Sequence, residues 1–147
     1  IIQKSPLSDF ISNNKALIKQ AIKKKNDRSL IIISLLNSSY SFAFDALQFF
    51  GKYLSVQEVV NRETIKKSLS GIYGGNRSTE IAIDSVVPMF IEAGLIQRPE
   101  KALYQLNPDF AVVSPITRAI YLESFKIWFG YDEMQEYQLR DPYFIFI

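Results

Sequence analysis

The hydrophobic positions between residues 76 and 93 recur at three- and four-residue spacing, which is the period of an α-helix with one buried face. The positions that share this face are Ala82, Ile83, Val86, Val87, Phe90 and Ile91. Ser78 or Thr79 can cap the start of the helix by accepting a hydrogen bond from a free backbone N–H. Gly94 follows the last apolar turn, where helices commonly end in a left-handed residue. The pattern therefore predicts a helix that ends just before Gly94.

Two short strands are predicted after this helix. Residues 95–98 and 103–106 have strand-like patterns, and residues 99–102, which include a proline, fit a turn between them. Before the helix, Gly74-Gly75-Asn76 forms a predicted turn that separates it from another helical stretch at residues 59–73. The predicted order is helix, turn, helix and β-hairpin.

The segment Glu92-Ala93-Gly94-Leu95-Ile96, followed by the hairpin at residues 97–106, resembles the end of the recognition helix and the β-wing of the winged helix-turn-helix family. The resemblance covers residues 28–107. It implies a domain that binds double-stranded DNA, with the first turn of the recognition helix at the bases and the wing near the DNA backbone.

Residues 7–25 also follow helical spacing, with an apolar face and a basic face. Lys15, Lys19 and Lys23 lie at four-residue intervals on the basic face. One interpretation is a stripe that faces phosphates, and the other is a solvated surface near the end of a helix. We therefore assign residues 1–27 to an N-terminal basic amphipathic helix that precedes the winged-helix domain.

Residues 28–53 predict a helix that is apolar on nearly all sides, and such a helix lies in a core or between subunits. Poor helix formers at residues 37–41 predict a break within it. The apolar run at residues 30–36 is much shorter than the ~20 residues that a membrane span requires, so we expect no membrane partner.

Residues 108–147 predict a C-terminal helical extension. Ser114 and Pro115 can start an apolar helix that ends at Gly130. This helix either forms a homodimer interface, because interfaces are rich in large aromatic residues, or packs on its own domain. The last residues, 141–147, predict a strand that needs a partner.

The chain has 147 residues and a formal net charge of +2, which is too small to indicate a nucleic-acid partner by itself. Residues 1–30 hold seven cations and two carboxylates, whereas residues 102–147 hold three cations and six carboxylates. The chain has no cysteine and no histidine, which excludes disulfides, thiol and imidazole catalysis, and zinc sites of the cysteine type. A cytoplasmic location fits this composition. Because the chain does not begin with Met, we expect an engineered segment, a processed chain or a fragment of a longer protein.

Catalytic motifs are not evident in the sequence. Asp132, Glu133 and Glu136 could gather a divalent ion, but a solvated acidic surface is the favoured interpretation. The glycine pair at residues 74–75 lacks the lysine–serine pair of a phosphate-binding loop. We expect no enzyme activity, no cofactor and no bound metal.

The outward face of the predicted recognition helix has few groups that commonly read bases. Asp84 and Glu92 are repelled by phosphates, and Pro88 removes one backbone hydrogen bond and predicts a kink. We expect base and phosphate contacts at the first turn of this helix and backbone contacts around it. The predicted DNA-binding residues are Lys66, Lys67, Asn76, Arg77, Ser78, Thr79, Arg98 and Lys101.

The sequence thus predicts a mainly α protein with a small β-hairpin wing, in which a winged helix-turn-helix domain carries N- and C-terminal helical extensions. The predicted function is sequence-specific binding of double-stranded DNA, as a transcriptional regulator or as the DNA-reading module of a larger protein. The alternative is a winged-helix module for protein–protein interaction or oligomerisation without DNA binding.

Overall fold

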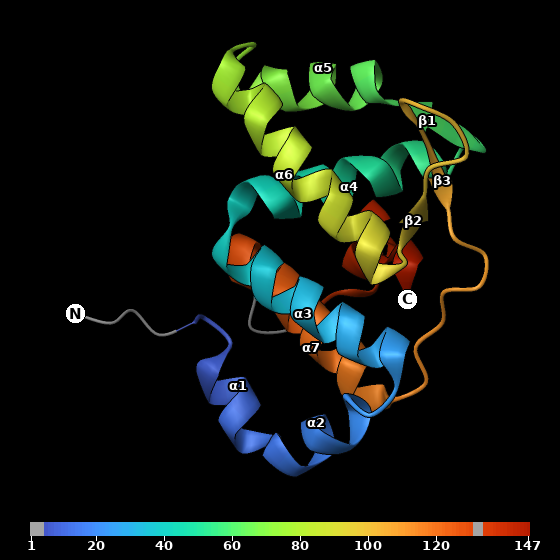
Figure 1. Cartoon of the computed structure of the whole chain (residues 1–147). Coiled ribbons are helices and arrows are strands. Elements are labelled where there is room, and N and C mark those ends of the chain that lie inside the picture. The colour runs from blue at the N-terminus through green and yellow to red at the C-terminus, as the bar shows by residue number, and fades with distance from the viewer. Residues whose placement is uncertain (1–4, 131–133) are drawn as a thin grey trace.

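The computed structural model describes residues 5–130 and 134–147 (Figure 1). In these residues the chain is mainly helical with a small β-structure, as the sequence predicts, but the β-structure is a three-stranded antiparallel sheet and not a hairpin alone. The α-helices are α1 Ser8–Asn13, α2 Lys15–Ala21, α3 Lys25–Ser39, α4 Ser41–Leu54, α5 Arg62–Tyr73, α6 Arg77–Ala93 and α7 Pro115–Phe129. The strands are β1 Val59–Asn61, β2 Ile96–Gln97 and β3 Leu103–Leu106, and the 3₁₀ helices are η1 Glu136–Arg140 and η2 Pro142–Phe146.

The N-terminal segment forms two short helices, so the prediction of a single basic helix is wrong at its centre. Asn14 separates α1 from α2, and its Nδ2 donates a hydrogen bond to the Phe10 carbonyl at 2.8 Å. This bond offers the backbone a local alternative to continuing the helix. Leu7 and Ala21 are buried and hold the two helices against α3 and α7.

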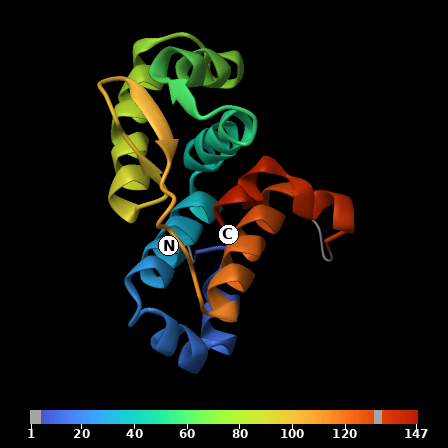
Figure 2. The ribbon, with the colours of Figure 1, turned by 90° about the vertical axis from the view of Figure 1, so that its right-hand side faces the viewer.

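Helices α3 and α7 pack side by side (Figures 1 and 2). The buried carboxylate of Asp27 in α3 accepts hydrogen bonds from the N–H groups of Val113 and Ser114, at 3.3 and 3.0 Å, and from the Thr117 hydroxyl at 2.6 Å. Asp27 therefore caps α7 from another helix, since Ser114 makes no side-chain cap. Burial alone would raise the pKa of Asp27, but the hydrogen bonds outweigh it and hold the pKa below its ordinary value.

Helix α4 lies between the α3–α7 pair on one side and the sheet on the other, and it contacts both α3 and β1 (Figure 1). The predicted break in the long apolar segment is present at Tyr40, whose backbone is extended, with φ −133° and ψ 101°. Phe50 of α4 is buried, and its ring meets the edges or faces of Phe90 and Tyr104 at centroid distances of 6.3 and 5.3 Å. One hydrophobic core thus joins α4, α6 and β3.

The sheet has the strand order β1-β3-β2, with β3 in the centre and all pairs antiparallel. Residues 59–61 form β1, so the helix predicted from residue 59 is wrong at its start. Asn61 has extended backbone angles, and its Oδ1 accepts a hydrogen bond from the Thr64 N–H at 2.8 Å. This cap begins α5 at Arg62, because the side chain satisfies a free N–H of the first turn.

The C-terminal residues form a short 3₁₀ helix, and the prediction of a strand that needs a partner is wrong. Asp141 accepts a hydrogen bond from the Tyr143 N–H, and Pro142 occupies the first turn, which favours a helical start. Tyr143 and Phe144 are buried against the core. Helix η2 approaches α4 closely, and this approach needs glycine at position 51, because a Cβ there would lie 2.1 Å from the Pro142 carbonyl oxygen.

No helix among residues 5–130 and 134–147 combines the length and apolar character needed to cross a membrane.

Candidate nucleic-acid interface

Helix α6 begins with an exposed first turn. Asn76, Arg77 and Ser78 are exposed, whereas Thr79 is only 3% exposed. The Thr79 hydroxyl donates a hydrogen bond to the Gly74 carbonyl at 2.7 Å, so this side chain serves the turn between α5 and α6. Of the four residues predicted here, three lie on the surface and Thr79 faces the interior.

The N-cap of α6 is Asn76, so the prediction that Ser78 or Thr79 caps this helix is wrong. The Asn76 Oδ1 accepts a hydrogen bond from the Thr79 N–H at 3.1 Å. The carboxamide oxygen is therefore committed to the helix, while Arg77 and Ser78 follow it on the exposed turn. Gly94 ends α6 in the predicted left-handed conformation, with φ 88°.

Two ion pairs connect α5 to α6. The Lys66 Nζ lies 2.5 Å from the Glu80 Oε1, and the Arg62 Nη2 lies 3.0 Å from the Asp84 Oδ1. The hydrogen bond from Lys66 lowers the pKa of Glu80, and the bond to Glu80 raises the pKa of Lys66. Two carboxylates of α6 are thereby neutralised, but Lys66, a predicted DNA contact, is engaged within the chain.

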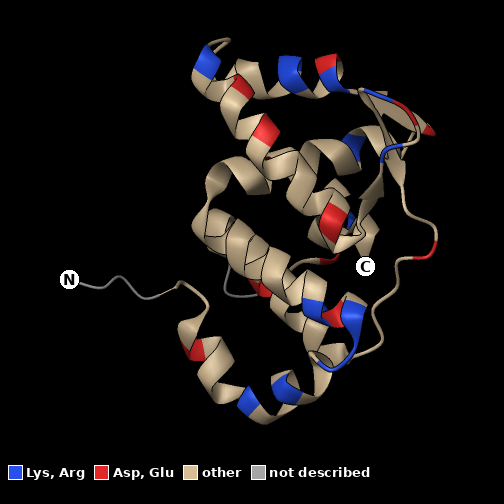
Figure 3. Cartoon of the chain, in the orientation of Figure 1, with Lys and Arg blue, Asp and Glu red and all other residues tan. Residues whose placement is uncertain are grey.

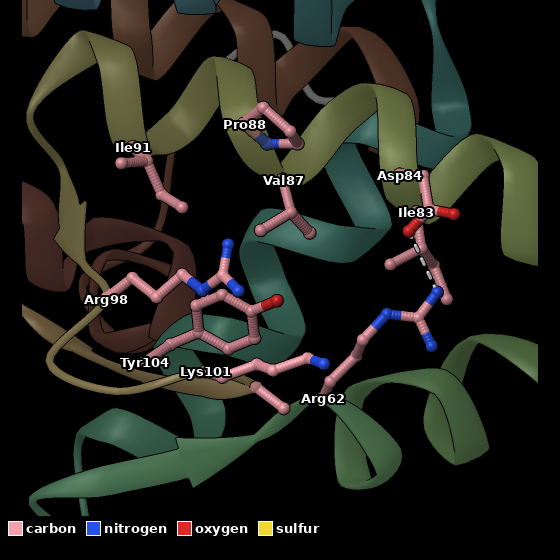
Figure 4. Close-up of a pocket in the computed structure, with 10 residues that line it drawn as sticks. Arg62, Ile83, Asp84, Val87, Pro88, Ile91, Arg98, Lys101 and Tyr104 are labelled. Carbon is pink, nitrogen blue, oxygen red and sulfur yellow. Dashed lines mark hydrogen bonds and ion pairs between the residues drawn. The ribbon is translucent and has the colours of Figure 1, made fainter.

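A cleft of about 260 Å³ lies between α6 and the β2–β3 hairpin (Figure 4). Arg98 and Lys101 of the hairpin reach into it, and Arg62 borders it from the start of α5. Arg62 is paired with Asp84, whereas no ion pair involves Arg98 or Lys101 among the described residues. The cleft thus gathers three cations and one carboxylate.

The floor of this cleft is apolar and contains one phenol. Ile83 and Val87 of α6 are buried, and Tyr104 of β3 is 6% exposed. Burial raises the pKa of Tyr104, while the nearby cations Arg98 and Arg62 oppose that shift. The phenol is therefore neutral near pH 7 and presents an O–H group beside the cations.

The turn of the hairpin is fixed against α5. Ala102 has φ 64°, and its carbonyl accepts a hydrogen bond from the Arg62 N–H at 2.9 Å. This bond ties the turn that carries Lys101 to the first residue of α5. The cations of the cleft consequently come from two segments that the backbone itself connects.

Charges are balanced over residues 55–107, which hold six cations and six carboxylates. Among the residues that the structure describes, four of these cations have no ion-pair partner. They are Lys67, Arg77, Arg98 and Lys101, all of them exposed and all predicted DNA contacts. The available positive charge is therefore concentrated at the first turn of α6, on α5 and on the hairpin.

Arg62 and Tyr104 are site residues that the sequence prediction missed. A signal for Arg62 is its position directly after Asn61, in an Asn-x-x-Thr pattern that caps a helix. Tyr104 occupies the inward position of a predicted strand, which indicates core packing more readily than a place in a site.

Among the described residues, no group of three or more Asp, Glu, His or Cys side chains gathers in a way that could hold a metal ion. The predicted acidic set includes Asp132 and Glu133, which lie outside the described residues, and Glu136, which pairs with Arg140 at 3.5 Å.

No protein-family model matches the chain, and neither the search of curated proteins nor the search of solved structures finds a match to it.

Proposed function

We propose that residues 28–107 contain a winged helix-turn-helix domain that binds double-stranded DNA, as a transcriptional regulator or as the DNA-reading module of a larger protein. The support is the element order α4-β1-α5-α6-β2-β3 together with the sheet order β1-β3-β2. In this proposal α5 and α6 are the helix-turn-helix, α6 is the recognition helix and the β2–β3 hairpin is the wing.

The observation that carries the proposal is the convergence of Arg62, Arg98 and Lys101 on the cleft beside α6. Arginine presents a planar fork that matches phosphate oxygens, and lysine adds a point charge. The neutral Tyr104 hydroxyl supplies a further donor. A DNA phosphate on this cleft orients the duplex against α6 without reading its sequence.

Base recognition is assigned to the first turn of α6. Arg77 is exposed there, and an arginine can bond to two acceptors of guanine in the major groove. Ser78 is exposed next to it and can bond to several bases. Further along the helix, Asp84 is engaged by Arg62 and Pro88 offers no hydrogen-bonding side chain. The proposal therefore limits sequence discrimination to a few base pairs.

The salt dependence of binding to a labelled duplex of random sequence tests this proposal. If each of the four cations without an ion pair among residues 55–107 neutralises one phosphate, these four contribute about −3.6 to the slope of log affinity against log salt. These contacts alone then lower the affinity by roughly 150-fold when the salt concentration rises fourfold. The double variant Arg98→Gln/Lys101→Gln should make the slope about 1.8 less steep.

The matched control is Lys52→Gln/Lys126→Gln, which removes the same charge from α4 and α7. It should leave the slope near that of the wild type. A wild-type protein that binds no duplex at low salt would end the proposal, as would equal effects of the two double variants.

A second candidate function is protein–protein interaction through α6, and the observation that favours it is exposed apolar surface. Ile81 and Met89 of α6 are 55% and 40% exposed. The substitution Arg77→Ala separates the two candidates, since it should weaken DNA binding and leave the mass in analytical ultracentrifugation unchanged. A changed mass with unchanged DNA binding would favour the assembly function.

The homodimer through α7 also stays a prediction. The inner side of α7 packs against α3, while Ile127 and Trp128 near its end are 38% and 39% exposed. The ultracentrifugation of the wild type at several concentrations measures this association directly.

A further inference from the structure

A second concentration of positive charge lies on α2 and at the start of α3, on the side of the folded molecule opposite to α5 (Figure 3). All of its side chains are exposed. We call it the basic N-terminal surface, and it consists of Lys15, Lys19, Lys23, Lys24, Lys25 and Arg28.

This surface has no carboxylate of its own. Residues 10–26 contain no Asp or Glu, and Asp27 is buried beneath α7, where it receives three hydrogen bonds. Within the described part of the chain, no ion pair reaches any of the six cations. By contrast, residues 55–107 hold equal numbers of cations and carboxylates.

The cations are also held close together. The Arg28 guanidinium donates a hydrogen bond to the Ile22 carbonyl at 3.3 Å, and the Lys23 Nζ donates one to the Gln20 Oε1 at 3.4 Å. Both bonds keep positive groups at the turn between α2 and α3. Like charges at such spacing oppose folding slightly, so the cluster does not contribute to the stability of the chain.

The basic N-terminal surface borders the recognition helix. A groove of about 500 Å³ between α3 and α6 is lined by Lys25 and Arg28 on one side and by Met89 and Glu92 on the other. The basic N-terminal surface therefore lies across this groove from the C-terminal half of α6. A long polyanion seated on α6 can extend onto it.

We propose that the basic N-terminal surface binds the phosphate backbone of the same duplex, beyond the segment that α6 reads. This inference rests on the proposed function for the identity of the polyanion. Lysine binds phosphates as a point charge and reads no base edge, so the added affinity is independent of sequence. Five of the six cations here are lysines.

The double variant Lys15→Gln/Lys19→Gln tests the proposal, with Lys52→Gln/Lys126→Gln as the control of equal charge. Binding is measured by fluorescence anisotropy on two long duplexes of unrelated sequence. The α2 variant should make the salt slope about 1.8 less steep on both duplexes. The loss of affinity caused by a fourfold rise in salt should then be roughly twelvefold smaller than in the wild type. Its melting temperature should not fall below that of the wild type, because both side chains are exposed.

An unchanged slope would overturn the proposal, as would an equal change in the control. If Lys15→Gln/Lys19→Gln loses binding to phosphatidylserine vesicles but keeps its duplex binding, the surface belongs to lipid headgroups and the proposal is overturned as well. Failure of the winged-helix proposal gives a different result, in which Arg98→Gln/Lys101→Gln has no effect while Lys15→Gln/Lys19→Gln still reduces the slope. Absence of duplex binding in the wild type would overturn both proposals.

Discussion

The buried carboxylate of Asp27 offers a demanding test of how the helices are held together. The substitution Asp27→Asn keeps the size of the side chain and removes its charge. In the wild type the carboxylate accepts hydrogen bonds from Val113, Ser114 and Thr117, at 2.6 to 3.3 Å. The amide has one acceptor oxygen and presents an NH₂ group to donors, so at least one buried donor loses its partner.

The expected cost follows from these bonds. A hydrogen bond to a charged group contributes about 1.5–3 kcal/mol, and an unsatisfied buried donor costs about 1–3 kcal/mol. Asp27 is 1% exposed, so water cannot replace the lost partner. We expect Asp27→Asn to lower the free energy of unfolding by about 2–4 kcal/mol at neutral pH.

The pH dependence of this loss identifies its origin. The pKa of Asp27 in the folded chain is lowered, while that of an unfolded aspartate is about 3.9. The stabilising contribution is therefore complete above the unfolded value and is lost as the pH falls through the folded value. The difference in unfolding free energy between wild type and Asp27→Asn should narrow below about pH 4.

Urea denaturation followed by circular dichroism at about pH 7 and about pH 3 measures both effects. Comparing wild type and variant at the same pH removes the titration of the other carboxylates. Equal stabilities at neutral pH would refute the capping role of Asp27. A difference of the same size at both pH values would show that the charge is not what stabilises α7.

Two further changes test the packing and the start of α6. Gly51→Ala places a Cβ against the Pro142 carbonyl oxygen and should destabilise the chain by about 3 kcal/mol in urea denaturation. Gly71→Ala, whose Cβ would have no neighbour within 4 Å, should instead stabilise the chain by about 0.5–1 kcal/mol. Equal effects of the two would contradict the close packing of η2. Asn76→Ala removes the cap that accepts from the Thr79 N–H and should lower thermal stability by about 1 kcal/mol, with Ser78→Ala as a near-neutral control.

Parts of the fold with a strong local signal could be predicted from the sequence. The apolar spacing of α6 and Gly94 at its end place this helix correctly, and the hairpin after it is present. Strand β1 could not be predicted, because three residues are too few for a periodicity and its partner β3 lies more than forty positions further along the chain. Its pairing is decided by long-range packing, which a local pattern does not contain.

The C-terminal residues show a different limit. The five consecutive apolar residues at positions 143–147 are compatible with a strand or with a buried helical turn. The absence of a Cβ at Gly51 and the cap at Asp141 decide between them in favour of a turn. The contact with Gly51 cannot be related to the segment before the chain is folded, whereas Asp141-Pro142 is a local signal for a helical start that the strand prediction did not use.

The exposure of several predicted site residues could be read from the sequence, but the geometry of the cleft could not. Arg77, Arg98 and Lys101 are exposed where the predicted turn and hairpin place them. The pairing of Lys66 with Glu80 joins two helices, and the sequence does not indicate which exposed charges on them will meet. The cap of α6 was assigned to the wrong residue because several adjacent side chains are suitable acceptors.

The proposed contact between the first turn of α6 and DNA can be tested with a tethered cleavage reagent. The chain has no cysteine, so Ser78→Cys and Tyr137→Cys each provide one attachment site for an iron–EDTA group. Both positions are exposed, and Tyr137 lies in η1, outside the proposed interface. We expect strong cleavage of a labelled duplex from position 78 and weak cleavage from position 137. Equal cleavage from the two positions, or none from position 78, would contradict the proposed contact.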